Sequence, residues 1–151
     1  MAPQNEPGGT DLFDLERFVV AQDTSASFLT ALDEIKSGHK STHWIWWIFP
    51  QLIGLGQSTI SWHYAVKSLD EARAYLAHPL LGPRLVEATE AMLDHVGVTA
   101  IALLGVDDVK FHSSMTLFAA AAAAEDSVFE RALNQFFSGV RDYQTVEMLD
   151  V

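Results

Sequence analysis

The strongest constraint on the fold of this chain is a series of helix-start signals separated by short breaks. Residues 68–71 (Ser-Leu-Asp-Glu) and 127–130 (Ser-Val-Phe-Glu) have the capping-box pattern. In this pattern a hydroxyl and a glutamate each satisfy a backbone amide that is free at the start of a helix. We therefore expect one helix to begin at Ser68 and end at His78-Pro79, and another to begin at Ser127 and end at Gly139.

Apolar residues at helical spacing predict further helices along the chain. The first spans residues 11–22, and the second begins at residue 23 or 25 and ends at Gly38. A third runs from Ser58 or Thr59 to Val66, and a fourth from about Pro83 to Val96. A longer helix begins at Asp107 and includes the alanines of 119–124. Gly38 can adopt the left-handed conformation that ends a helix, and alanine has the highest helix propensity. The pattern is that of a mainly α protein.

One segment, 41–56, breaks the helical pattern. Its run of aromatic and β-branched residues before Pro50 predicts a strand or extended segment, and Gly54 and Gly56 predict a turn after it. The expected fold class is therefore mainly α (α+β), with at most a small β-hairpin. We expect a single compact domain over residues 11–151, preceded by a disordered tail over residues 1–10.

Composition narrows the possible partners. The 151 residues include nine Lys+Arg and 20 Asp+Glu, and the net charge of −11 argues against binding to a nucleic-acid polymer or an anionic membrane. Cysteine is absent, which excludes disulfides and thiolate nucleophiles. The apolar runs are shorter than the roughly 20 residues of a membrane helix, and residues 1–10 lack the apolar core of a secretory leader. We expect a cytoplasmic protein, and its oligomeric state stays open.

The tryptophan-rich segment 43–51 is the first candidate for chemistry. In a strand, Trp44 and Trp46 would share one face and Trp47 the other. Large apolar side chains usually pack in the core, and this explains each indole equally well. Alternatively, one indole face stacks on a planar heterocycle, an interaction that contributes about 1–3 kcal/mol.

Residues 107–116 form the second candidate. On a helix Asp107, Lys110 and Ser114 share one face, where a carboxylate, an ammonium and a hydroxyl could bind a ribose or a phosphate. A helix start with an ordinary surface ion pair explains the same residues. The sequence contains no metal-ligand spacing, phosphate-binding loop or serine nucleophile elbow, so we expect no metal and no cofactor.

Segments 38–58, 64–66, 71–85 and 107–118, in this order, resemble the family catalogued as domain of unknown function 1810 (DUF1810), over roughly residues 11–150. That family is in turn similar to the YbiA-like (NADAR) superfamily, whose characterised members cleave N-glycosidic bonds of riboflavin-pathway intermediates or of ADP-ribosylated guanine. The resemblance implies a mainly helical fold with a small β element. The superfamily's Ser-Glu-His-Tyr motif corresponds to residues 61–64, so Trp62 stands where the relatives have a functional glutamate. Lys110 matches a lysine of the relatives, but Val106 replaces the tryptophan that precedes it.

The resemblance implies an N-glycosidase that hydrolyses the N-ribosyl bond of a nucleotide or ADP-ribose derivative. The oxocarbenium-like transition state needs a carboxylate, which Asp107 or Asp108 would supply, and His43 would donate the proton. The ring would stack on Trp44 or Trp47, and Lys40, Arg84 or Lys110 would hold phosphate. The full set of expected ligand contacts is Lys40, Trp44, Trp47, Gln51, Gly56, Ser58, Tyr64, Arg84, Lys110 and Ser114.

Two alternatives explain the same residues: a non-catalytic nucleotide or ADP-ribose sensor, and a protein-interaction module that uses the tryptophan-rich segment as a hot spot. Both ligand hypotheses require that the tryptophan-rich segment and residues 107–116 line one shared cavity.

Overall fold

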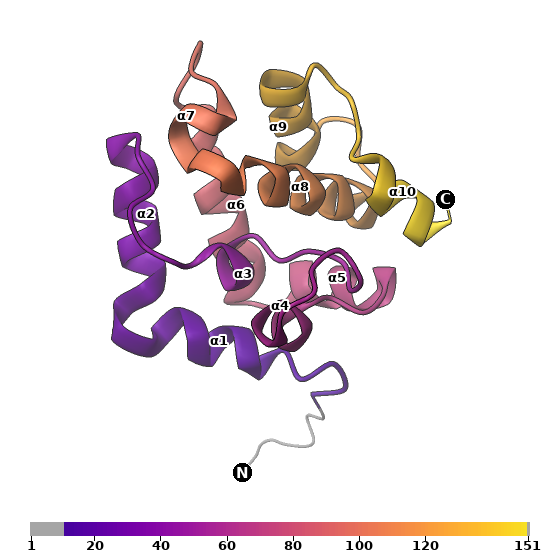
Figure 1. The fold of residues 1–151 in the computed structure, drawn as a ribbon. Coiled ribbons are helices and arrows are strands. Elements are labelled where there is room, and N and C mark those ends of the chain that lie inside the picture. Colours follow the sequence, from indigo (N-terminus) through magenta and orange to yellow (C-terminus); the bar gives the residue numbers. More distant parts are fainter. Residues whose placement is uncertain (1–10, 151) are drawn as a thin grey trace.

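The structure, a computed structural model, describes residues 11–150 (Figure 1). This part of the chain consists of helices connected by turns and loops. The expected disordered tail over residues 1–10 lies outside the described residues. In chain order the elements are α1 Glu16–Asp23, η2 Thr24–Ala26, α2 Ser27–Ser37, α3 Ile45–Ile48, α4 Thr59–Tyr64, α5 Leu69–Ala77, α6 Leu81–Leu93, α7 Ala100–Leu104, η3 Gly105–Asp107, α8 Asp108–Ala122, α9 Val128–Phe137 and α10 Tyr143–Leu149.

Helix α8 is the centre of the packing. It contacts α5 on one side and α9 on the other, and α6 packs against α2, α5 and α9 behind it (Figure 1). Aromatic contacts continue this core toward the N-terminus. The ring of Tyr75 on α5 lies 5.3 Å from that of Phe118 on α8 and 5.1 Å from that of Phe18 on α1, and all three side chains are fully buried. None of the described helices has the length and apolar character to cross a membrane.

Both predicted capping boxes start helices where expected, but each uses only its hydroxyl half. The Ser68 and Ser127 hydroxyls accept hydrogen bonds from the backbone amides three residues later, at 3.1 and 3.2 Å. The glutamates of the two boxes instead form tertiary ion pairs, Glu71 with Arg17 and Glu130 with Arg141. The pattern therefore predicts the helix starts correctly. However, Glu71 accepts the Lys67 amide at 3.0 Å instead of the Ser68 amide, and both carboxylates also pair with arginines elsewhere in the chain.

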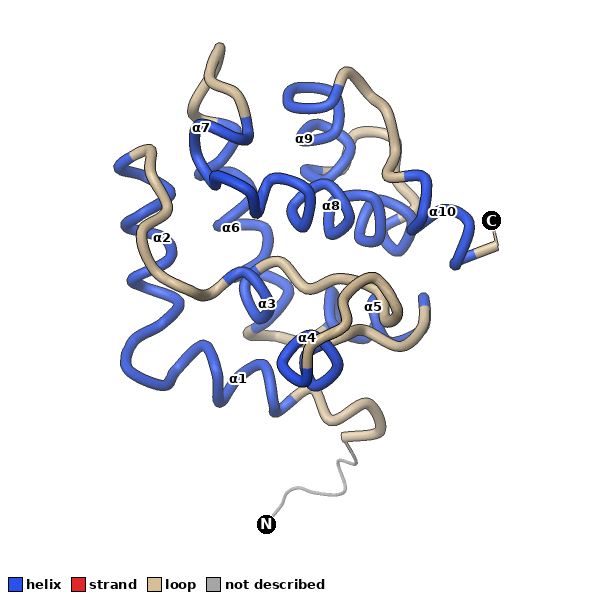
Figure 2. Tube along the Cα trace, viewed as in Figure 1, coloured by secondary structure: helices blue, strands red, loops and turns tan. Residues whose placement is uncertain are grey.

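The strand or extended segment expected over 43–51 is wrong for its central residues. Residues Ile45–Ile48 form one helical turn, α3, and residues 11–150 contain no strand (Figure 2). The physical reason is that a helical turn buries Ile45 and Ile48 together with Trp44, whereas strand alternation would place Ile45 and Ile48 on opposite faces. A single parallel bridge between Leu52 and Val66 stands in place of the expected hairpin.

Helices α7 and α10 begin at caps that sequence periodicity missed. The Thr99 hydroxyl accepts a hydrogen bond from the Ala102 amide, and the Asp142 carboxylate accepts one from the Thr145 amide, both at 3.1 Å. Val96, expected on the apolar face of the preceding helix, lies beyond the end of α6 and is 81% exposed. Helices α7 and α10 have five and seven residues, which are too few to show a clear apolar period in the sequence.

A buried ion pair joins α1 to α5. The Arg17 guanidinium lies 2.7 Å from the Glu71 carboxylate, and both side chains are almost fully buried. Arg17 also donates to the backbone oxygens of His63 and Ala65, each at 2.8 Å, at the end of α4. One side chain thus connects α1, α4 and α5.

Replacing Glu71 with alanine should therefore destabilise the protein strongly, because the guanidinium would remain buried without its counter-charge. We expect the free energy of unfolding, measured by urea denaturation, to fall by about 3–5 kcal/mol. The matched control is Asp70→Ala on the same helical turn, since Asp70 is 80% exposed and pairs only with Arg73. The control should change stability by less than about 1 kcal/mol. Equal effects of the two substitutions would contradict this role of the buried pair.

Candidate functional site

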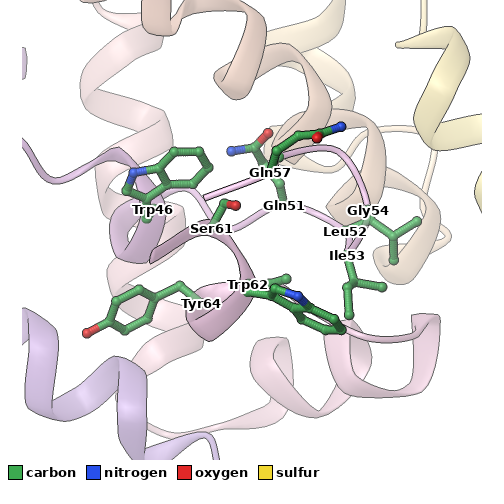
Figure 3. A pocket seen from close by; sticks show the side chains of 11 residues that line it. Trp46, Gln51, Leu52, Ile53, Gly54, Gln57, Ser61, Trp62 and Tyr64 are labelled. Atoms are coloured by element: carbon green, nitrogen blue, oxygen red, sulfur yellow. The ribbon is translucent and has the colours of Figure 1, made fainter. Parts of the chain in front are cut away.

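A cavity of about 350 Å³ lies between α3, the 51–57 loop and α4 (Figure 3). It is lined by aromatic, amide and small side chains: Trp46, Gln51, Leu52, Ile53, Gly54, Gly56, Gln57, Ser61, Trp62, Tyr64 and Ala65. The backbone bridge between Leu52 and Val66 connects its two sides, because the Ile53 amide donates to Val66 O at 2.7 Å.

Two indoles stand on different sides of this cavity (Figure 3). Trp46 is on α3 and is half-buried, whereas Trp62 is on α4 and is 62% exposed. An exposed indole presents an apolar face on which a planar ring can stack. The pair therefore offers aromatic surface to a planar group.

Gly56 allows the loop to approach α4 closely. A Cβ atom at this position would lie 2.6 Å from the Ser61 Cβ and 3.5 Å from the Trp46 ring. Ser61 is held in turn by Ser58, whose hydroxyl caps α4 and whose carbonyl accepts the Ser61 hydroxyl at 2.8 Å. Of these predicted contacts, Gly56 lines the cavity, while Ser58 positions Ser61 from outside the lining.

Two buried side-chain polar atoms in the described part of the chain have no hydrogen-bond partner, Gln51 Nε2 and Ser114 Oγ. The sequence singled out both residues. Gln51 lines the cavity and is only 9% exposed. Ser114 is fully buried on α8, and its neighbours Ser113 and Thr116 both donate to carbonyls one helical turn earlier, at 3.2 and 2.9 Å.

A charged cluster adjoins the Trp46 wall. Lys110 Nζ lies 5.1 Å from the centroid of the Trp46 ring, and the Asp107 carboxylate pairs with Lys110 at 3.1 Å and with Lys40 at 2.9 Å. Burial acts to raise the pKa of Asp107, but hydrogen bonds from the two lysines outweigh it and lower the pKa. Asp107 is therefore ionised. Residues 107–116 meet the tryptophan-rich segment at Trp46, but none of them lines the cavity, so the expected lining by both segments is not formed.

The indoles predicted to stack, Trp44 and Trp47, lie elsewhere. Trp44 is 1% exposed and donates its indole N–H to Glu34 at 2.9 Å, so its faces are covered by the core. Trp47 donates to the Ser27 hydroxyl at 2.9 Å and packs 5.2 Å from the ring of Tyr64. The helical turn of α3 directs Trp46 into the cavity in their place.

The remaining predicted residues are also outside the cavity lining. Arg84 faces a separate hollow between α1, α2 and α6, where it pairs with Asp23 at 3.0 Å. His43 is exposed in the loop before α3, and Asp108 is half-buried in the first turn of α8. Within residues 11–150, no group of three or more histidine and carboxylate side chains could hold a metal ion.

Glu34 was not singled out from sequence, yet it fixes the segment that leads into α3. Its carboxylate accepts hydrogen bonds from the Ser41 amide at 2.7 Å, from the Thr42 amide and hydroxyl at 3.0 and 2.6 Å, and from the Trp44 indole. Burial acts to raise the pKa of Glu34, but these donors lower it from 4.5 to about 2. Glutamate on an exposed helix face is too common a pattern to reveal this role.

The low pKa of Glu34 predicts a pH-dependent contribution to stability. A carboxyl group whose pKa is lower in the folded than in the unfolded state stabilises the fold above its unfolded value of 4.5, and this stabilisation is lost as the pH falls toward 2. Glu34→Gln should therefore lower the urea midpoint clearly at pH 6 and much less at pH 3. The exposed neighbour Asp33 supplies the control, Asp33→Asn, whose urea midpoint should be nearly equal to that of wild type at each pH. A Glu34→Gln deficit that is the same at pH 6 and pH 3 would contradict the assignment.

Comparison with known proteins agrees with this fold. The family model described as "Protein of unknown function (DUF1810)" matches residues 12–149. The crystal structure of a conserved hypothetical protein from Mycobacterium tuberculosis, Rv1873, is similar with a TM-score of 0.88 and 43% sequence identity, over 93% of this chain and 99% of that chain. A search of curated proteins finds no match.

Proposed function

The chain belongs to the DUF1810 family, and we propose that its cavity binds the heterocyclic ring of a nucleotide or nucleoside as a non-catalytic ligand site. The observation that carries this proposal is the pair of indoles, Trp46 and Trp62, on different sides of one cavity. Base–indole stacking is worth about 1–3 kcal/mol per ring and needs little more than an accessible face. The volume of the cavity, about 350 Å³, is at the lower end of the volumes of ordinary small-molecule sites.

The polar groups of the lining suit a neutral ring. They are the side-chain amides of Gln51 and Gln57 and the hydroxyl of Ser61, with no carboxylate, lysine or arginine among the lining residues, and the Tyr64 hydroxyl points away from them (Figure 3). Amides and hydroxyls both donate and accept hydrogen bonds, so they can pair with the nitrogen and oxygen atoms on the edge of a heterocycle. The cavity therefore favours a base over a free anion.

The charged cluster next to Trp46 carries positive charge that can attract a phosphate. Lys40 and Lys110 together with Asp107 leave one net positive charge beside the cavity, on a protein whose overall charge is −11. A local positive potential can attract an anionic group at short range despite a negative envelope. The phosphate of a bound nucleotide would lie toward Lys110.

Hydrolysis of the N-ribosyl bond is the second candidate function. It is favoured by Asp107, an ionised carboxylate in contact with the lysine that covers Trp46. However, a general acid and a stabilising carboxylate must be within hydrogen-bond reach of the reacting bond, and Asp107, Asp108 and His43 are all absent from the lining. An ADP-ribose derivative is a candidate ligand for both functions.

A protein-interaction module has less support, because only Trp62 of the four tryptophans is mainly exposed.

Trp62→Ala tests the binding proposal with little risk to the fold, since the side chain is 62% exposed. We expect the dissociation constant for adenosine or AMP, measured by calorimetry, to rise about tenfold, because one stacking face is lost. The control Ile101→Ala removes a 58% exposed apolar side chain on α7, outside the lining, and should leave affinity unchanged. Equal affinities of wild type and Trp62→Ala would contradict the site.

The same samples separate binding from hydrolysis. Incubation of wild-type protein with adenosine, AMP and ADP-ribose, followed by chromatography, should return each compound intact. Release of free base that Asp107→Asn or Asp108→Asn abolishes would instead establish the N-glycosidase.

A further inference from the structure

The side-chain amide of Gln51 is buried at the cavity without a hydrogen-bond partner for its nitrogen. The backbone carbonyl of Gln51 accepts the Val66 amide at 2.8 Å beside the bridge between Leu52 and Val66. The fold thus uses the main chain at this position, and the described residues give the side-chain nitrogen no role. Buried polar groups are almost always paired, so an unpaired one at a cavity needs an explanation.

The other polar side chains of the lining differ from Gln51 in this respect. The Ser61 hydroxyl already donates to Ser58 O at 2.8 Å. Gln57 is exposed, so water can pair with its amide. In Figure 3 the amide of Gln51 lies between Trp46 and Gln57, at the aromatic wall of the cavity. Gln51 Nε2 has almost no accessible surface, so a ring stacked on this wall meets the nitrogen once the side-chain amide turns toward it.

We propose that Gln51 is the specificity-determining residue of the cavity, and that it selects rings carrying an adjacent hydrogen-bond donor and acceptor on one edge. This inference rests on the proposed ring-binding function. A glutamine amide presents one donor, Nε2, and one acceptor, Oε1, side by side, and the terminal torsion turns easily. It can therefore form two parallel hydrogen bonds with an amino group next to a ring nitrogen, as in adenine, or with a lactam edge.

The experiment compares two nucleosides that differ only at this edge. Adenosine carries the amino group beside a ring nitrogen, and purine riboside lacks the amino group but keeps the ring and the sugar. By calorimetry on the full-length protein, wild type should bind adenosine about tenfold more tightly than purine riboside, because the second hydrogen bond is lost. Gln51→Met, which preserves length but not the amide, should bind the two nucleosides equally. Gln144→Met, the same change at an exposed position on α10 outside the lining, should keep the preference.

Stability without ligand separates specificity from a structural role. Because Gln51 Nε2 has no partner to lose, the melting temperature of Gln51→Met should equal or exceed that of wild type. A preference for adenosine that persists in Gln51→Met, or a melting temperature several degrees below wild type, would overturn the inference. Equal wild-type affinity for both nucleosides would overturn it as well, while leaving the ring-binding function in place. Absence of binding to either would remove both proposals.

Discussion

The buried guanidinium of Arg17 is the interaction on which the geometry of the cavity depends. Its five N–H groups are all used: they donate to the carbonyls of Phe13, Asp14, His63 and Ala65 and to the Glu71 carboxylate. A charge this deep in the protein is tolerated only when it is paired and fully hydrogen-bonded. The carbonyls of His63 and Ala65 lie at the C-terminal end of α4, the helix that carries Ser61, Trp62 and Tyr64. One wall of the cavity is thereby anchored to α1 and α5.

The opposite wall is anchored to a different core helix. Glu34 on α2 accepts hydrogen bonds from Ser41 and Thr42 and from the Trp44 indole, and so fixes the chain just before α3 and Trp46. Neither indole wall therefore depends on the ligand for its position. A site whose walls are held before binding loses less conformational entropy when a ligand enters, which favours affinity from a small contact area.

Local signals predicted much of the fold but less of the site. The hydroxyl caps at Ser58, Ser68 and Ser127 depend on the nearest few residues, and each starts a helix in the structure. The tryptophan-rich run was misassigned because a short apolar segment has no clear period, and one helical turn changes which indole faces the cavity. Arg17 and Glu34 act over longer separations in the sequence, and an isolated arginine or glutamate gives no local signal.

Only some of the expected ligand contacts lie in or beside the cavity. Gln51, Gly56 and Tyr64 line the cavity, and Lys40 and Lys110 lie in the charged cluster beside it. Arg84 also belongs to a segment that carries the family resemblance, so the resemblance does not distinguish it from these residues. Arg84 faces another hollow because α6 turns it toward Asp23, which no local pattern could indicate.

In the proposed site Trp46 and Trp62 hold a planar ring, while Trp44 and Trp47 pack in the core. The four tryptophans give four indole N–H signals in a nitrogen–proton NMR spectrum, and single Trp→Phe variants would assign them. Titration with adenosine should move the Trp46 and Trp62 signals in proportion to occupancy and leave the Trp44 and Trp47 signals nearly in place. Shifts confined to Trp44 or Trp47, or no shift at saturating adenosine, would contradict the account.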